Sequence, residues 1–182
     1  VIFQEPATSF NPVMMVGDQV AEMIRTHSTC GRTEARARAG EWLRRVGIPR
    51  PEEAYDAYPH ELSGGLKQRA MIAMALSADP KVVVADEPTT ALDVTVARQV
   101  LELLNDLKRE RGLTLIFITH DLALLPGIAD RVALMYAGEI VEMAPTEAFL
   151  AHPEHPYAQA LLGALPRPDG APLQPVEGSV PN

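Results

Sequence analysis

The chain has 182 residues, of which 47% are hydrophobic and 22% charged, the balance of a folded globular protein. Its formal net charge of −8 argues against general nucleic-acid binding, which needs a basic surface. The single cysteine, Cys30, excludes an internal disulfide. We expect a fragment of a longer protein, because the chain begins without Met inside an expected strand and ends without a capping element.

The N-terminal half predicts helices. Residues 1–3 predict a short strand that runs into a loop over residues 4–12, where two prolines occur. Beyond it, residues 16–78 contain no strand candidate. Three helices are predicted, starting near residues 16, 34 and 63. The signals are the helical spacing of apolar residues from Val16, an Ala-, Arg- and Leu-rich stretch, and a run that stops at Asp79.

From residue 81 the pattern changes to alternating strands and helices. Continuous apolar runs predict strands buried on both faces at residues 82–85 and 115–119. The remaining expected elements are helices at 94–111 and 121–129 and strands at 131–136 and 140–143, the last two forming a hairpin at the end of the sheet. This order is typical of an α/β fold. The Pro-rich tail after Arg167 predicts a linker or extended arm.

Two adjacent carboxylates, Asp86 and Glu87, end the first of these apolar strands. Open α/β sheets bind ligands at the carboxyl ends of their strands. In nucleotide hydrolases the first carboxylate can hold Mg²⁺, and the second is then placed to orient or deprotonate a water. Taken alone, the motif is equally compatible with two solvated acids.

A second motif, Ser63-Gly64-Gly65, opens an expected helix. It exposes backbone N–H groups at the positive end of the helix dipole, which makes a candidate phosphate cradle. The alternative is a plain helix N-cap at Ser63, with glycines for flexibility.

Together these motifs resemble those of ATP-binding cassette ATPases, in order and spacing, over nearly the whole chain. Residues 62–66 resemble the signature motif and residues 82–86 the Walker B motif. The resemblance implies that Glu87, His120 and Gln4 are catalytic, that Asp86 and Gln4 hold Mg²⁺, and that Ser63, Gly64, Gly65 and Asp93 contact ATP. Single residues keep ordinary alternatives: a polar loop residue for Gln4, a structural histidine for His120 and a helix N-cap for Asp93.

The resemblance also implies the fold, an α/β P-loop NTPase-type parallel sheet with an inserted all-helical subdomain. Residues 1–9 are expected to form a strand and the Q-loop of the ATPase core, and residues 10–80 the helical subdomain that ends in the signature helix. Residues 81–151 would carry the core with Walker B, the D-loop and the switch histidine. Residues 152–182 would form a C-terminal helix and the Pro-rich tail.

Further stretches narrow the resemblance to ATPases of oligopeptide, dipeptide and nickel importers: residues 3–6, 8–12, 155–157, 160–162 and 166–168. Leu66, where the family commonly has Gln, is interpreted as a mark of this subfamily. The P-loop pattern G-x-x-x-x-G-K-[ST] is absent from the sequence, so the fragment alone is expected not to hydrolyse ATP.

The implied function is that of an ATP-hydrolysing energy-coupling subunit of an importer for peptides or similar small solutes. Expected partners are a second ATPase subunit, membrane permease subunits and indirectly a solute-binding protein, but no nucleic acid. The expected location is peripheral, on the cytoplasmic face of the cell membrane. The alternative is a non-catalytic binding module. A chromosome-maintenance ATPase is disfavoured, because no sustained heptads separate Gln4 from Ser63.

The six arginines between residues 32 and 50 are compatible with contacts to lipid headgroups or to the permease. A solvated helix face is the favoured interpretation of this run.

Overall fold

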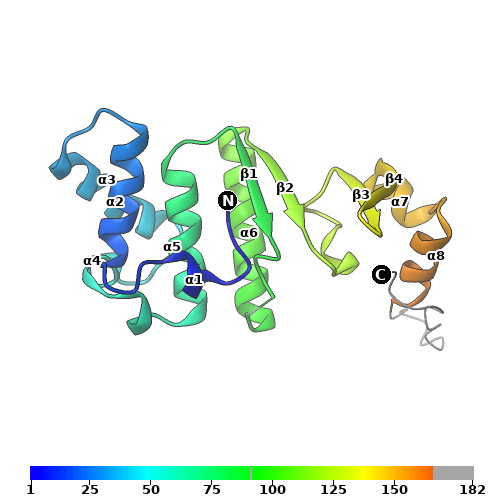
Figure 1. Cartoon of the computed structure of the whole chain (residues 1–182), viewed down its shortest axis with the longest axis horizontal. Coiled ribbons are helices and arrows are strands. Elements are labelled where there is room, and N and C mark those ends of the chain that lie inside the picture. The colour runs from blue at the N-terminus through cyan, green and yellow to red at the C-terminus, as the bar shows by residue number, and fades with distance from the viewer. Residues whose placement is uncertain (91, 166–182) are drawn as a thin grey trace. The chain divides into compact units, whose positions relative to one another are not determined.

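The computed structural model describes residues 1–90 and 92–165, which form two compact units (Figure 1). The first unit covers Val1–Thr119 and the second begins at His120. The predicted tail after Arg167 lies outside the described residues. The expected four-part division of the chain stays a prediction.

Helices fill the first unit up to its first strand. They are α1 (Pro6–Ser9), α2 (Val16–His27), α3 (Arg32–Arg45), α4 (Pro51–Asp56), the 3₁₀ helix η1 (Pro59–Glu61) and α5 (Gly64–Ser77). The three predicted helices are confirmed as α2, α3 and α5. The loop predicted over residues 4–12 is wrong in part, because the short helix α1 forms there with Pro6 at its first position, where its fixed φ suits a helix.

The sheet of the first unit consists of two parallel, directly paired strands, β1 (Val82–Asp86) and β2 (Thr114–Ile118). The helix α6 (Val94–Arg111) connects them in the sequence. The strand expected at residues 1–3 is reduced to one parallel bridge between Ile2 and Ala85. In this bridge the Ile2 N–H donates to the Val84 carbonyl at 2.8 Å and the Ile2 carbonyl accepts from the Asp86 N–H at 2.9 Å. The bridge attaches the N-terminal segment to the strand that carries the paired carboxylates.

The prediction that both strands are buried on both faces is wrong. Val83 and Ala85 pack into the core with α5 and α6, but Val82 is 52% exposed. On β2, Ile116 and Ile118 are 49% and 46% exposed. Apolar runs do not distinguish a strand covered on two faces from one that helices cover on a single face.

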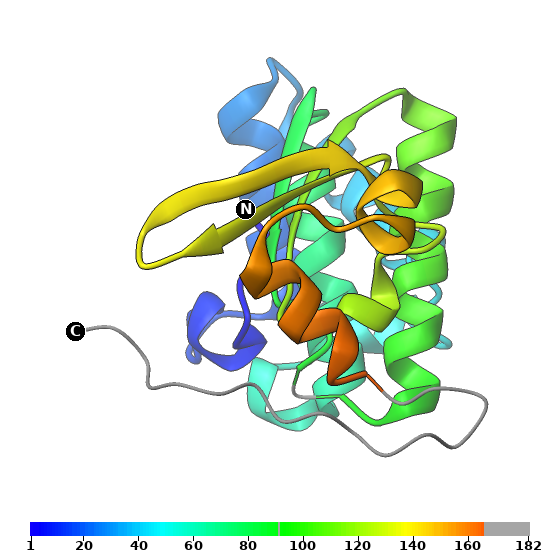
Figure 2. The ribbon, with the colours of Figure 1, turned by 90° about the vertical axis from the view of Figure 1, so that its right-hand side faces the viewer.

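The second unit contains the 3₁₀ turn η2 (Leu122–Leu124), β3 (Arg131–Tyr136), β4 (Glu139–Pro145), α7 (Thr146–Ala151) and α8 (Pro156–Gly163) (Figure 2). The predicted antiparallel hairpin is confirmed. Ala137 and Gly138 in its turn have φ of 51° and 83°, as a two-residue hairpin turn of the I′ type requires.

Two expectations for the second unit are wrong. Within the described residues β3 and β4 form a two-stranded sheet of their own instead of extending β1 and β2. The helix expected at 121–129 is limited to η2, because Pro126 lacks a backbone donor and Gly127 takes a positive φ of 86°.

One testable consequence of this packing concerns Gly17 of α2. A Cβ on Gly17 would lie 2.1 Å from the Cγ atom of Tyr55, a residue that is 4% exposed. We expect Gly17→Ala to lower the free energy of unfolding by about 1–3 kcal/mol, because the buried ring has to move. Chemical denaturation of the chain measures the change.

Gly40 provides the matched control. It also lies within a helix, α3, but a Cβ there would meet nothing within 4 Å. Gly40→Ala should therefore raise the free energy of unfolding by about 0.5–1 kcal/mol. Equal effects of the two substitutions would show that the Tyr55 contact does not constrain Gly17.

Candidate functional site

Glu87 occupies a strained position directly after β1. Its φ of 42° lies in the left-handed region, which costs a non-glycine residue about 1–3 kcal/mol. The Glu87 N–H donates to the Ile118 carbonyl of β2 at 3.0 Å, and the Glu87 carbonyl accepts from the Thr90 N–H at 3.2 Å. Strain that neighbouring hydrogen bonds maintain is typical of functional positions.

The Glu87 carboxylate is held by two side-chain donors. Gln4 Nε2 and Thr90 Oγ1 each donate to Glu87 Oε2 at 2.8 Å. Gln4 is 83 positions away in the sequence, and the Ile2–Ala85 bridge brings it to the end of β1. The structure thus brings together two of the predicted catalytic residues. Thr90 was missed by sequence reasoning, although its place three residues after Glu87 in a turn is a usable signal.

Asp86 is the last residue of β1 and is half-buried next to Glu87. Among the described residues no group of three or more His, Cys, Asp or Glu side chains is arranged to hold a metal. Mg²⁺ does not need such a group, because it usually takes one or two carboxylates and completes its shell with water and phosphate oxygens. A carboxylate from Asp86 and the amide oxygen Oε1 of Gln4 fit this donor chemistry.

Ser63 is the N-cap of α5. Its Oγ accepts from the Leu66 N–H at 3.4 Å, and its carbonyl accepts from the Lys67 N–H at 2.9 Å. Ser63 and Gly64 are both exposed. Since the first amides of a helix have no acceptor in a preceding turn and carry the positive end of the dipole, this turn has the chemistry of an anion site.

Asp93 is the corresponding N-cap of α6, and its Oδ1 accepts from the Val96 N–H at 3.0 Å. A Cβ on Gly65 would lie 2.7 Å from Val96 Cγ1, so the starts of α5 and α6 touch. The structure therefore places the turns at Ser63 and Asp93 at neighbouring helix ends. Ala91, two residues before Asp93, lies outside the described residues.

His120 is the first residue of the second unit and is exposed. The geometry above forms two groups within the first unit, Gln4 with Asp86 and Glu87, and the Ser63–Gly65 turn with Asp93. The roles of all these residues stay predictions.

Two family models match different parts of the chain. The family model described as "ABC transporter" matches residues 1–90, and the model "Oligopeptide/dipeptide transporter, C-terminal region" matches residues 141–182. This chain belongs to the ABC transporter family. The predicted resemblance, including its oligopeptide and dipeptide subgroup, is thereby confirmed.

Among the curated relatives of this ABC transporter chain are two proteins of Bacillus subtilis (strain 168). The oligopeptide transport ATP-binding protein OppD is 51% identical over 166 residues, which cover 91% of this chain and 46% of OppD. The oligopeptide transport ATP-binding protein AppD is 49% identical over 183 residues, a match that covers 100% of this chain and 56% of AppD. The chain therefore spans about half the length of these relatives.

Solved structures confirm the predicted fold of this ABC transporter chain. The structure of cbiO1 from Clostridium perfringens, described as part of the transporter complex cbiONQ, has a TM-score of 0.71 at 31% identity. The match covers 83% of this chain and 58% of cbiO1. A dimeric post-hydrolysis state of the ATP-binding cassette MJ0796, bound to ADP and Pi, has a TM-score of 0.68 at 28% identity. It covers 80% of this chain and 62% of MJ0796.

Proposed function

We propose that the whole protein is an ATP-hydrolysing energy-coupling subunit of a membrane importer for peptides or similar small solutes. The hydrogen bond from Gln4 to Glu87 at the end of β1 carries this proposal, because it joins two groups suited to handling a water next to a phosphate. The names of OppD and AppD, both oligopeptide transport ATP-binding proteins, support the class of solute.

In the proposed reaction, the γ-phosphoryl group of ATP is transferred to water and ADP leaves. Mg²⁺, when bound, would neutralise the developing charge. Asp86 and Gln4 Oε1 would hold the metal. The carboxylate of Glu87 accepts a proton from the attacking water, in the orientation that Gln4 and Thr90 fix by their hydrogen bonds. We propose that His120 contacts the γ-phosphate.

We further propose that two ATPase subunits act together. The exposed Ser63–Gly65 turn and Asp93 would face the nucleotide bound by the second subunit, where the turn's free amides meet negatively charged oxygens. The dimeric structure of MJ0796 supports a paired assembly.

The helical part of the first unit is the surface that we propose for the permease. A cavity of about 370 Å³ lies among α2, α3 and α4 and is lined by residues that include Asp18, Arg25, Arg32 and Tyr55. Burial and the hydrogen bond to Asp18 raise the pKa of Tyr55 to about 12, so its hydroxyl stays protonated. We propose that this recess accepts one side chain of a docking helix, which a flat surface could not accommodate.

The arginine run beside this cavity is largely engaged in exposed ion pairs. Arg36 pairs with Asp56 and Arg44 with Glu52, each at 2.8 Å. Exposed pairs of this kind contribute little to stability, about 0–1 kcal/mol each. They support the solvated-face interpretation of the run over lipid contact.

None of the helices in residues 1–90 and 92–165 has the length and hydropathy that a membrane span requires. We propose attachment through permease subunits at the cytoplasmic face of the membrane, with a solute-binding protein as an indirect partner. The experiment is peptide uptake into vesicles that hold the permease, driven by ATP and the whole protein. Uptake that is independent of the ATPase subunit would contradict the proposal.

The 182-residue chain by itself is expected not to hydrolyse ATP. Its sequence lacks the P-loop, whose backbone amides and lysine position the β- and γ-phosphates in enzymes of this class. ATP turnover by the purified chain is the measurement, with Glu87→Gln as the control for contaminating ATPase. Turnover that disappears in Glu87→Gln would show that the P-loop is dispensable.

A further inference from the structure

The first two turns of α5 and α6 contact each other at two levels. At the first level, Gly65 lies against Val96, where a Cβ would leave only 2.7 Å to Val96 Cγ1. At the second level, Arg69 Nη2 donates to Gln99 Oε1 at 2.9 Å. Residues four apart on α5 and three apart on α6 share a helix face, so both contacts lie along one seam.

Arg69 also binds the end of a third helix. Its Nη1 donates to the carbonyl of Val46, the C-cap of α3, at 2.6 Å. Gly47 follows with a φ of 78°, and a Cβ there would lie 2.8 Å from Arg69 Nη1. A carbonyl at a helix C-terminus lacks a helical partner and carries partial negative charge, so a guanidinium is well suited to it.

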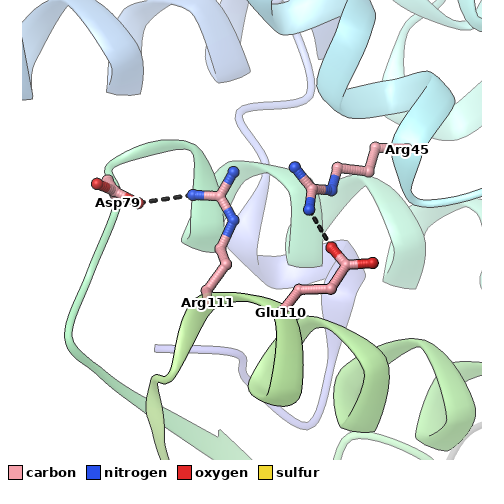
Figure 3. A network of polar contacts seen from close by, with 4 residues as sticks. All are labelled: Arg45, Asp79, Glu110 and Arg111. Carbon is pink, nitrogen blue, oxygen red and sulfur yellow. Dashed lines mark hydrogen bonds and ion pairs between the residues drawn. The ribbon is translucent and has the colours of Figure 1, made fainter.

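The same end of α3 is attached to the last turn of α6 (Figure 3). Arg45 of α3 pairs with Glu110, and Arg111 pairs with Asp79 at 2.6 Å. The guanidinium carbons of Arg45 and Arg111 lie 5.4 and 4.6 Å from the ring centroid of Trp42, which is 7% exposed. The end of α3 is thus joined to the last turn of α6. Arg69 of α5 connects the same end of α3 to Gln99, near the start of α6.

We propose that Arg69 is a positioning residue that holds the Ser63 turn of α5 and the Asp93 turn of α6 in one fixed relation. The inference rests on the proposed function, in which both turns face a nucleotide on a second subunit. Arg69 acts through the two turns. Its guanidinium fork is needed because it reaches two acceptors in different elements at once.

The test is ATP-driven pairing of the whole protein in a Glu87→Gln background, followed by sedimentation. Arg69→Lys keeps the charge but cannot reproduce the fork, and Gln99→Ala removes one acceptor. Each should weaken pairing by roughly ten- to a hundredfold, the effect of one hydrogen bond to a charged group, while ATP binding to single subunits is unchanged. Gln99→Glu keeps the acceptor that Gln99→Ala removes, so this variant should pair as strongly as the protein with Gln99.

The double variant Arg69→Lys/Gln99→Ala should be no weaker than the worse single variant, because both remove the same link. Arg98→Lys is the matched control, since Arg98 pairs with Glu102 on its own helix at 2.9 Å. Normal pairing in Arg69→Lys, or additive losses in the double variant, would overturn the inference. Failure of the Glu87→Gln protein without further substitutions to bind ATP and pair would instead contradict the proposed function.

A second measurement does not depend on nucleotide. Spin labels at Gly64→Cys and Val94→Cys, with Cys30→Ser, report the distance between the two turns at exposed positions. Arg69→Lys should broaden the distance distribution at a temperature where the variant is still fully folded, and Arg98→Lys should not. An unchanged distribution in Arg69→Lys would overturn the positioning role even if pairing could not be measured.

Discussion

Replacing Glu87 with Gln in the whole protein is expected to lower ATP hydrolysis by roughly 10²–10⁴-fold, the usual contribution of a general base. The amide has the size of the carboxylate, and its oxygen can still accept from Gln4 and Thr90, as Glu87 Oε2 does. It cannot take a proton from water. Nucleotide affinity should therefore stay close to that of the unsubstituted protein, which an equilibrium binding measurement beside the turnover rate will show.

Glu102→Gln is the control for this substitution. Glu102 is an exposed carboxylate of α6 whose recorded ion pair is with Arg98, so its loss should leave turnover unchanged. Steady-state rates in Glu87→Gln that match those of the Glu102→Gln control would remove Glu87 from the catalytic role.

Introducing a charge at Ser63 should prevent ATP-driven pairing. Asp and Asn cap helices about as well as Ser does, so both Ser63→Asp and Ser63→Asn keep the cap that Leu66 N–H now donates to. Only Asp adds a negative charge, which would repel the phosphates proposed to lie against the turn. Ser63→Arg should also block pairing, because its side chain fills the same space.

Size-exclusion chromatography with ATP, in the Glu87→Gln background, separates the two interpretations of Ser63. Pairing should be lost in Ser63→Asp and Ser63→Arg and kept in Ser63→Asn. If Ser63→Asp pairs normally, the turn is a helix cap and nothing more.

Much of the helical fold follows from local sequence signals. Apolar spacing and stop residues predicted α2, α3 and α6, and Gly112 ends α6 with a φ of 60°. Start and stop residues predicted α5, which is buried on more than one face. The exposure of Ile116 and Ile118 was not predictable, since an apolar run is the same whether one or both faces are packed. The short helix α1 was hidden because Pro6 reads as a loop residue as readily as a helix start.

The candidate site was predicted as a set of residues and only partly as a geometry. Motif order identified Gln4 and Glu87, but their hydrogen bond depends on the single bridge at Ile2. The approach of Gly65 to Val96 depends on how two helices pack, which neither helix encodes alone. Thr90 was missed although it follows Glu87 by three residues in a turn, because the order of the motifs does not include its position.

The central claim is that each ATP site is shared, with Glu87 from one subunit and the Ser63 turn from the other. Mixing two inactive forms of the whole protein, Glu87→Gln and Ser63→Asp, tests it most directly. In a mixed pair one site would hold both defects and the other none, so we predict that ATP turnover reappears on mixing. Mixed pairs that form, as shown by differently tagged subunits, and yet hydrolyse no more ATP than the separate variants would contradict the account.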